Sequence, residues 1–165
     1  FVNIQLQAVL DDTTKKSVNA PLMLRALWWF RWGAMWTLVT GLLMLHFSNF
    51  PLNSDWGVKI LTGGIFGILM WANVWFVIWP AQKVVIKSNE QVASGGAALP
   101  EAAALAPKAL LASRTNTLFS IPMLFYMGAA SHLPMSIDTT KQMTWWIVLA
   151  VVAGGLEFNA LKGKL

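Results

Sequence analysis

The sequence predicts an all-α protein that crosses a lipid bilayer several times as a bundle of transmembrane helices. Hydrophobic residues make up 56% of its 165 residues, whereas charged residues make up only 12%. A soluble domain carries about 25% charged residues. The charges also leave long gaps, from Arg31 to Asp55, from Lys59 to Lys83 and from Arg114 to Asp138. Each gap is long enough for the ~20 apolar residues that a membrane helix needs.

These gaps and one further apolar run give four spans, at about 27–47, 58–80, 116–134 and 143–161. The last span carries one charge, Glu157. Tryptophan is typical of the interface between membrane and water, and tryptophans gather near the ends of the spans, at Trp28, Trp29, Trp56, Trp79, Trp145 and Trp146. The sequence begins with Phe1, and its first ten residues resemble the end of an apolar helix. We therefore expect one more span upstream.

The basic residues predict how the spans are oriented. If all four spans cross, ten of the 12 Lys and Arg residues lie on one side and only Lys59 and Lys141 lie on the other. Cytoplasmic segments carry the excess of Lys and Arg. The segment before the first span, the 81–115 connection and the C-terminus should therefore be cytoplasmic. The predicted location is a bacterial inner membrane.

The 81–115 connection is expected to be a cytoplasmic loop. Gly95 and Gly96 interrupt any helix, and Pro100 can begin a new one. Two interpretations stay open for the Ala-rich part that follows: a short surface helix over about 100–113, or a partly ordered linker.

The composition excludes several kinds of chemistry. The sequence contains no cysteine, which excludes disulfides, iron–sulfur ligation and a covalently attached c-type haem within this chain. The net charge of +5 is spread between apolar runs instead of forming a basic patch. We therefore expect a membrane partner and no nucleic acid.

The two histidines are candidates for binding a cofactor. At 1.5 Å per residue, His46 lies ~22 Å from Arg31 and His132 lies ~27 Å from Arg114 along their spans. Both imidazoles should therefore reach a similar depth near the outer face. They could bind a shared b-type haem axially, or hold a metal together with nearby methionine thioethers. Each could equally be a single interfacial residue that hydrogen-bonds water or headgroups.

A polar cluster is predicted near the inner side of the bundle. It comprises Arg31, Asn73, Arg114, Asn116 and Glu157. Ionisable residues inside a membrane are costly and usually paired, so an Arg31–Glu157 pair is expected, with a hydrogen bond from Asn73. The cluster is either a site for a proton, a quinone headgroup or a small anion, or a structural clasp between helices. No catalytic constellation is visible.

Three stretches resemble the membrane region of the bacterial membrane-anchored urate oxidase (urate hydroxylase) family. They are ALWWFRWGAMWTLVTGLLML, NVWFVIWPAQKVVI and RTNTLFSIPMLFYMGAASHLP. The positions that match the family pattern are Trp29, Phe30, Trp32, Thr37 and Gly41, then Trp79, Pro80, Gln82 and Lys83, then Pro122, Ser131, His132 and Pro134. The resemblance covers roughly residues 20–161.

In that family a cytochrome c domain follows the membrane region, but this sequence contains no C-x-x-C-H motif. The resemblance implies a redox-linked membrane protein. We expect an accessory or anchoring subunit of a larger complex, whose partners are lipid, other membrane subunits and a cytochrome c. The alternative is a module that binds b-type haem and transfers electrons, or an enzyme that oxidises urate.

Overall fold

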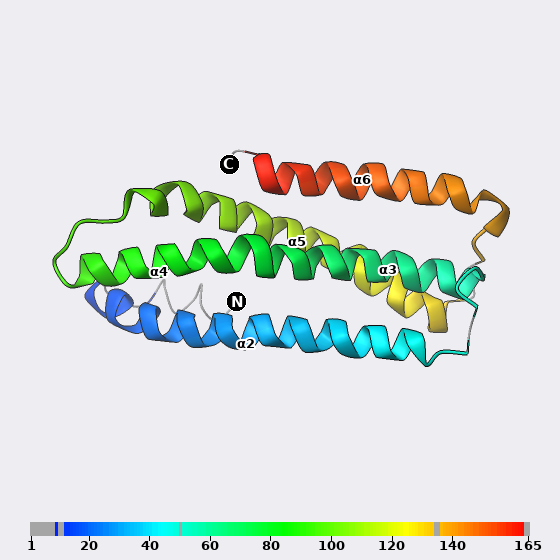
Figure 1. The fold of residues 1–165 in the computed structure, drawn as a ribbon, viewed down its shortest axis with the longest axis horizontal. Helices are drawn as coiled ribbons and strands as arrows, with labels where there is room; N and C mark the ends of the chain where they lie inside the picture. Colours follow the sequence, from blue (N-terminus) through cyan, green and yellow to red (C-terminus); the bar gives the residue numbers. More distant parts are fainter. Residues whose placement is uncertain (1–8, 10–11, 50, 134–135, 164–165) are drawn as a thin grey trace.

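The computed structural model describes residues 9, 12–49, 51–133 and 136–163, and every regular element within them is helical. The all-α prediction is therefore confirmed for this part of the chain. Its helices form four long rods that lie side by side and alternate in direction (Figure 1). The rods are α2 (Asp12–His46), the α3–η1–α4 rod (Asp55–Ala72, Asn73–Ile78 and Trp79–Ala93), α5 (Pro100–His132) and α6 (Gln142–Lys162). A 3₁₀ turn, η2 (Thr139–Lys141), precedes α6.

The second rod begins at Asp55 because Ser54 caps it. Ser54 has an extended backbone, and its Oγ accepts a hydrogen bond from the Gly57 N–H at 3.2 Å. Such a cap satisfies one of the free N–H groups at the start of a helix, and the carboxylate of Asp55 is favourable in the first turn. The helix therefore starts slightly before the expected span.

The same rod continues past the expected end of its span through a π-helical segment. In η1 the N–H of Trp79 bonds to the carbonyl of Val74, five residues earlier. Pro80 follows immediately, and a proline ring clashes with the carbonyl four residues before it in a regular helix. The wider π turn changes that register. Helical structure therefore passes through Pro80 without ending.

The expected 81–115 loop is mostly helical. Residues up to Ala93 belong to α4, and α5 begins at Pro100, so only residues 94–99 connect them. Gly95 has φ +87°, a left-handed conformation that glycine adopts without strain. The Leu99 N–H donates to Ser88 Oγ at 3.0 Å, which closes the connection. The loop was expected because charged residues mark the ends of the predicted spans. Charged residues limit how deeply a helix enters the bilayer, but a helix can continue past them into water.

The core lies between the second rod and α5. Phe66, Phe119 and Ala153 form one buried cluster, and Val74, Ile78 and Ala112 form another further along the rod. Gly63 permits the close approach of α3 to α5. A Cβ at that position would lie 2.7 Å from Met127 Cγ and 3.0 Å from the Met123 backbone oxygen.

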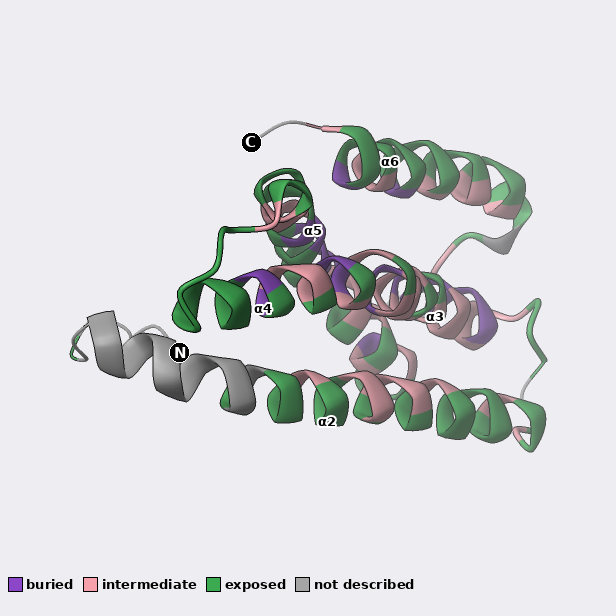
Figure 2. Cartoon of the chain, turned by 60° about the vertical axis from the view of Figure 1, so that its left-hand side comes forward, coloured by how far each residue is buried: buried purple, intermediate pink, exposed green. Residues whose placement is uncertain are grey.

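Both α2 and α6 lie at the outside of the bundle, and the side of each that faces away from the core is exposed (Figure 2). Two helical segments of the described chain are long and apolar enough to cross a membrane, Asp55–Ala93 and Gln142–Lys162. The other two expected spans lie within α2 and α5. The tryptophans and Arg31 lower the mean hydropathy of the span in α2, and Asn116 with several Ser and Thr residues lowers that of the span in α5.

Candidate functional site

A chain of hydrogen-bonded side chains connects three helices where the π-helical segment begins. Asn73, the first residue of η1, is 1% exposed. Its Nδ2 donates to Oδ1 of Asn116 on α5 and to Oε2 of Glu157 on α6, each at 2.9 Å. Asn116 Nδ2 donates in turn to the backbone oxygen of Met70 at 3.0 Å. We call Asn73, Asn116 and Glu157 the amide–carboxylate cluster.

The cluster forms where the α-helix passes into the π turn. A π turn moves each backbone donor to a carbonyl one residue further back than in an α-helix. The Met70 carbonyl, just before this turn, accepts from the Asn73 N–H and also from the Asn116 side chain. The cluster is not fully satisfied, because Asn73 Oδ1 is buried and has no hydrogen-bond partner among the described residues.

Glu157 also faces an apolar groove between α3 and α6. The groove has a volume of about 670 Å³, and Glu157 is the only ionisable residue among the described residues of its wall. The rest of the wall is made of Ile65, Leu69, Trp146, Leu149, Ala150, Ala153, Gly154, Phe158 and Leu161. The Glu157 carboxylate therefore lies between the buried amide of Asn73 on one side and the apolar wall of the groove on the other. This arrangement holds α6 in place and can present a single hydrogen-bonding group to an apolar ligand or helix.

Arg31 does not form the expected pair with Glu157. Its guanidinium carbon instead lies 4.2 Å from the ring centroid of Trp79, 4.7 Å from that of Trp75 and 5.9 Å from that of Trp32. Arg31 is half-buried, and its Nε has no hydrogen-bond partner in the described chain. The prediction failed because α2 packs on α4 and η1, whereas Glu157 approaches Asn73 from α6.

Arg114 also lies apart from the amide–carboxylate cluster. It is exposed on α5, although Thr115 and Asn116 beside it are buried. The structure thus joins three of the five residues predicted as a polar cluster and separates the two arginines from them. A helical periodicity alone does not tell which face of α5 is turned inward, and here the amide faces the core and the guanidinium does not.

The two histidines lie at the same end of the bundle, where α2 and α5 finish. Both are exposed, and His46 packs on the ring of Phe47 with centroids 5.1 Å apart. Neither imidazole has a described hydrogen bond, and neither lines the groove at Glu157. The described residues hold no group of three or more side chains that could bind a metal ion. Haem or metal binding by His46 and His132 stays a prediction.

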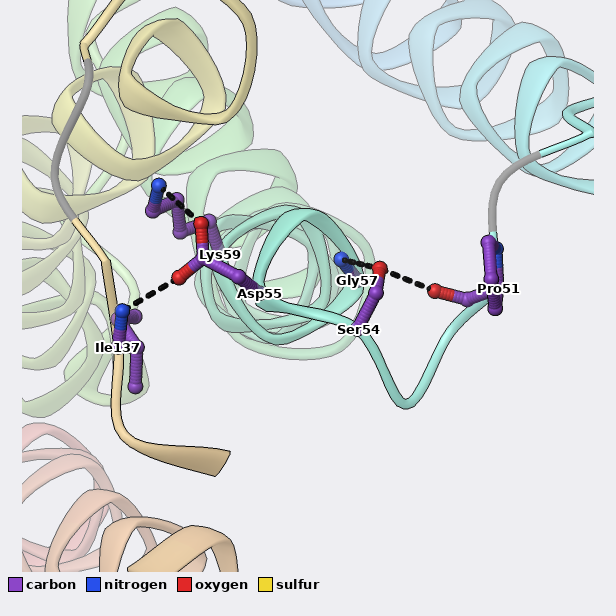
Figure 3. A network of polar contacts seen from close by, with 6 residues as sticks. All are labelled: Pro51, Ser54, Asp55, Gly57, Lys59 and Ile137. Carbon is purple, nitrogen blue, oxygen red and sulfur yellow. Dashed lines mark hydrogen bonds and ion pairs between the residues drawn. The ribbon is translucent and has the colours of Figure 1, made fainter. Parts of the chain in front are cut away.

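A second polar network at the end of the bundle was missed from the sequence. Lys59 is 2% exposed, and its Nζ lies 2.7 Å from Asp55 Oδ2. The other carboxylate oxygen of Asp55 accepts from the Ile137 N–H, so the start of α3 is tied to the segment before α6 (Figure 3). The i,i+4 spacing of Asp55 and Lys59 could have indicated this pair, but the bond to Ile137 depends on tertiary structure.

Two further contacts fix the start of α6. Trp145 Nε1 donates to Thr62 Oγ1 at 3.0 Å. In the preceding turn, hydrogen bonds from the Thr140 hydroxyl and backbone N–H hold the pKa of the Asp138 carboxyl below its usual value. We call the contacts of Asp55, Lys59, Ile137, Thr62 and Trp145 the outer network. It is built from ion-pair and cross-helix bonds and anchors the start of α6 to α3.

Comparison with known proteins gives one result. The profile of the family described as "Urate oxidase N-terminal" matches residues 47–160. The match includes two of the three stretches that carry the resemblance, and it begins after the tryptophan-rich stretch of α2. No curated protein and no solved structure matches the chain.

Proposed function

The chain belongs to the urate oxidase N-terminal family, and we propose from this premise that it is an integral membrane accessory or anchoring subunit of a bacterial, redox-linked complex. The family match confirms the resemblance seen in the sequence. The proposal adds the membrane location, the orientation and the role within a complex.

Exposed apolar surface is the observation that carries the proposal. In the two helical segments that could cross a membrane, only 28% and 11% of the most apolar window is buried. A comparable helix in a soluble core would be mostly buried. Large apolar side chains are exposed on all four rods, for example Trp36, Phe76, Leu124 and Val151. We infer that lipid covers these faces and that all four rods cross the bilayer.

The distribution of charge supports one orientation. The end of the bundle near residues 94–99 carries most of the basic residues, so we assign it to the cytoplasm. At the opposite end both lysines are paired with acids, Lys59 with Asp55 at 2.7 Å and Lys141 with Asp138 at 3.7 Å. Their charge is therefore neutralised locally. This arrangement supports a cytoplasmic C-terminus.

The apolar groove at Glu157 supports an accessory role. A groove with apolar walls and one hydrogen-bonding group suits a helix of another membrane subunit. In this proposal the partners are the lipid bilayer, a further membrane subunit and a cytochrome c that accepts electrons from the complex.

Cysteine labelling provides the test, because the sequence contains no cysteine. Single variants Asn49→Cys, Ser136→Cys and Ala98→Cys each introduce a thiol at an exposed position in a connection. In one preparation, isolated membranes are washed with alkaline carbonate, which removes peripheral proteins and should leave this chain in the membrane. Labelling uses a separate preparation. In intact spheroplasts a membrane-impermeant maleimide should label positions 49 and 136, and should label position 98 only after lysis. Release by carbonate, or labelling of position 98 in intact spheroplasts, would contradict the proposal.

A second candidate function follows from family membership and from the two histidines at one end of the bundle. In it the chain binds a b-type haem or takes part directly in urate oxidation. The imidazoles of His46 and His132 are exposed and do not share a described pocket, so the geometry does not fit a haem held between them. A reduced-minus-oxidised visible absorption spectrum of the purified protein tests whether haem is bound. Haem bands that vanish in His132→Ala would favour this candidate over the accessory role.

A further inference from the structure

Two cations approach the same indole, that of Trp79, at the start of α4 in the second rod. The guanidinium carbon of Arg31 lies 4.2 Å from the ring centroid of Trp79, and Lys83 Nζ lies 5.7 Å from it. Arg31 also contacts the rings of Trp75 and Trp32. We call Arg31, Trp75, Trp79 and Lys83 the Trp79 site. It combines residues of α2, η1 and α4, on a different side of η1 from the amide–carboxylate cluster.

Neither cation of the Trp79 site has a carboxylate partner in the described chain. The ion pairs between described residues are Lys59–Asp55 and Lys141–Asp138, and neither includes Arg31 or Lys83. Two N–H donors of the site, Arg31 Nε and Trp75 Nε1, are buried without an acceptor. Aromatic faces stabilise a cation only weakly compared with a hydrogen-bonded anion. The site therefore carries two positive charges that no described carboxylate neutralises and two N–H donors that no described acceptor satisfies.

The position of the site indicates which anions can reach it. Trp79 lies at the inner end of the predicted span 58–80, and Lys83 lies one turn beyond it. On the neighbouring helix α2, Trp28, Trp29 and Phe30 are 45%, 71% and 60% exposed. Exposed aromatic residues at this level are typical of the lipid headgroup region. Basic sites between helices at the cytoplasmic face bind anionic headgroups.

We propose that Arg31 and Lys83 bind the phosphate of an anionic phospholipid in the cytoplasmic leaflet, with Trp75 and Trp79 forming the apolar wall against its glycerol and acyl region. The proposal rests on the membrane location proposed above. A guanidinium can donate two parallel hydrogen bonds to phosphate oxygens, and Lys83 adds a second charge from the adjacent helix. A lipid bound in this way would also hold α2 against the rest of the bundle.

Native mass spectrometry of the detergent-purified protein provides the test. The full chain, recovered from carbonate-washed membranes, is mixed with equal amounts of phosphatidylglycerol and phosphatidylcholine. We expect retention of phosphatidylglycerol to exceed that of phosphatidylcholine by at least about fivefold, the ratio that a single headgroup cation supports. Equal retention of the two lipids by the wild-type protein would overturn the proposal without any variant being needed.

Matched variants test whether the preference for phosphatidylglycerol arises at the Trp79 site. Arg31→Gln and Lys83→Gln should each remove most of the preference for phosphatidylglycerol, whereas Arg114→Gln, which removes an equal charge from an exposed position on α5, should keep it. Equal losses in Arg31→Gln and Arg114→Gln would reduce the effect to general charge and refute the site. Complete displacement of the lipid by inorganic phosphate would identify a soluble anion site instead. A chain that carbonate releases from the membrane would refute the proposed function, a result separate from any of these.

Discussion

Asn73 Nδ2 lies 2.9 Å from Glu157 Oε2, so a residue of the π-helical segment donates a hydrogen bond to the last helix across 84 sequence positions. This bond attaches α6 to the second rod at the level where Asn116 attaches α5. Together with the Trp145–Thr62 hydrogen bond and the buried Ala153, it holds α6 against the rest of the bundle.

Replacing Asn73 with Ala should destabilise the bundle. The substitution removes the shared donor and leaves the Asn116 and Glu157 oxygens without it, and an unsatisfied buried polar group costs about 1–3 kcal/mol. Thermal unfolding in detergent would measure the loss. Asn89→Ala, an exposed position on α4, is the matched control. If both variants unfold at the same temperature, the cluster has no stabilising role.

Replacing Glu157 with Gln should leave stability close to that of the wild type. The amide oxygen of the introduced glutamine would still accept the hydrogen bond from Asn73, and no charge would need to be placed in an apolar groove. Glu157→Leu should destabilise, because it removes the acceptor. If Glu157→Gln unfolds as readily as Glu157→Leu, the negative charge itself is required, and a cationic partner must neutralise it.

Two neighbouring glycines should differ sharply in their response to substitution. At Gly63 a Cβ would lie 2.7 Å from Met127 Cγ and 3.0 Å from the Met123 backbone oxygen, whereas at Gly64 nothing lies within 4 Å. Gly63→Ala should therefore cost about 1–3 kcal/mol through overpacking. Gly64→Ala should be neutral or stabilise by up to ~1 kcal/mol through helix propensity. Equal unfolding midpoints would show that α3 and α5 do not pack this closely.

Replacing Asp55 with Asn should weaken the outer network. Lys59 is 2% exposed, but the Asp55 side chain is 39% exposed and water screens the pair, so the expected cost is about 1–3 kcal/mol. The control is Asp138→Asn, whose partner Lys141 is largely exposed, so little change is expected there. Chemical unfolding of both variants in the same detergent would compare them. A large loss in Asp138→Asn with none in Asp55→Asn would reverse this assignment.

Much of the helical organisation could be predicted from charge spacing. The break at Gly95 and the start at Pro100 follow from local backbone chemistry, because one residue adopts positive φ and the other lacks an N–H. The lengths of the helices could not be predicted in the same way. Residues 81–93 were expected to be loop, and residues 100–113 either a short surface helix or a partly ordered linker. Both stretches belong to long helices, because charged residues outside a bilayer are compatible with a helix.

The polar cluster could be predicted only in part. Asn73, Asn116 and Glu157 are rare polar residues in apolar runs, and such residues need partners in any membrane helix. Their choice of partners depends on helix rotation and neighbour order. Arg31 lay at a level where a pair with Glu157 was reasonable. However, α2 and α6 lie on different sides of the second rod (Figures 1 and 2), and tryptophan rings contact the guanidinium instead.

The sequence by itself determined that this chain is helical, apolar and related to the urate oxidase N-terminal family, because composition, charge spacing and motifs are properties of the chain order. Only the tertiary structure decided which polar groups meet. Hydrogen bonds and cation–ring contacts act over a few ångströms. The packing of one helix on another therefore decides that Glu157 reaches Asn73 while Arg31 contacts Trp79.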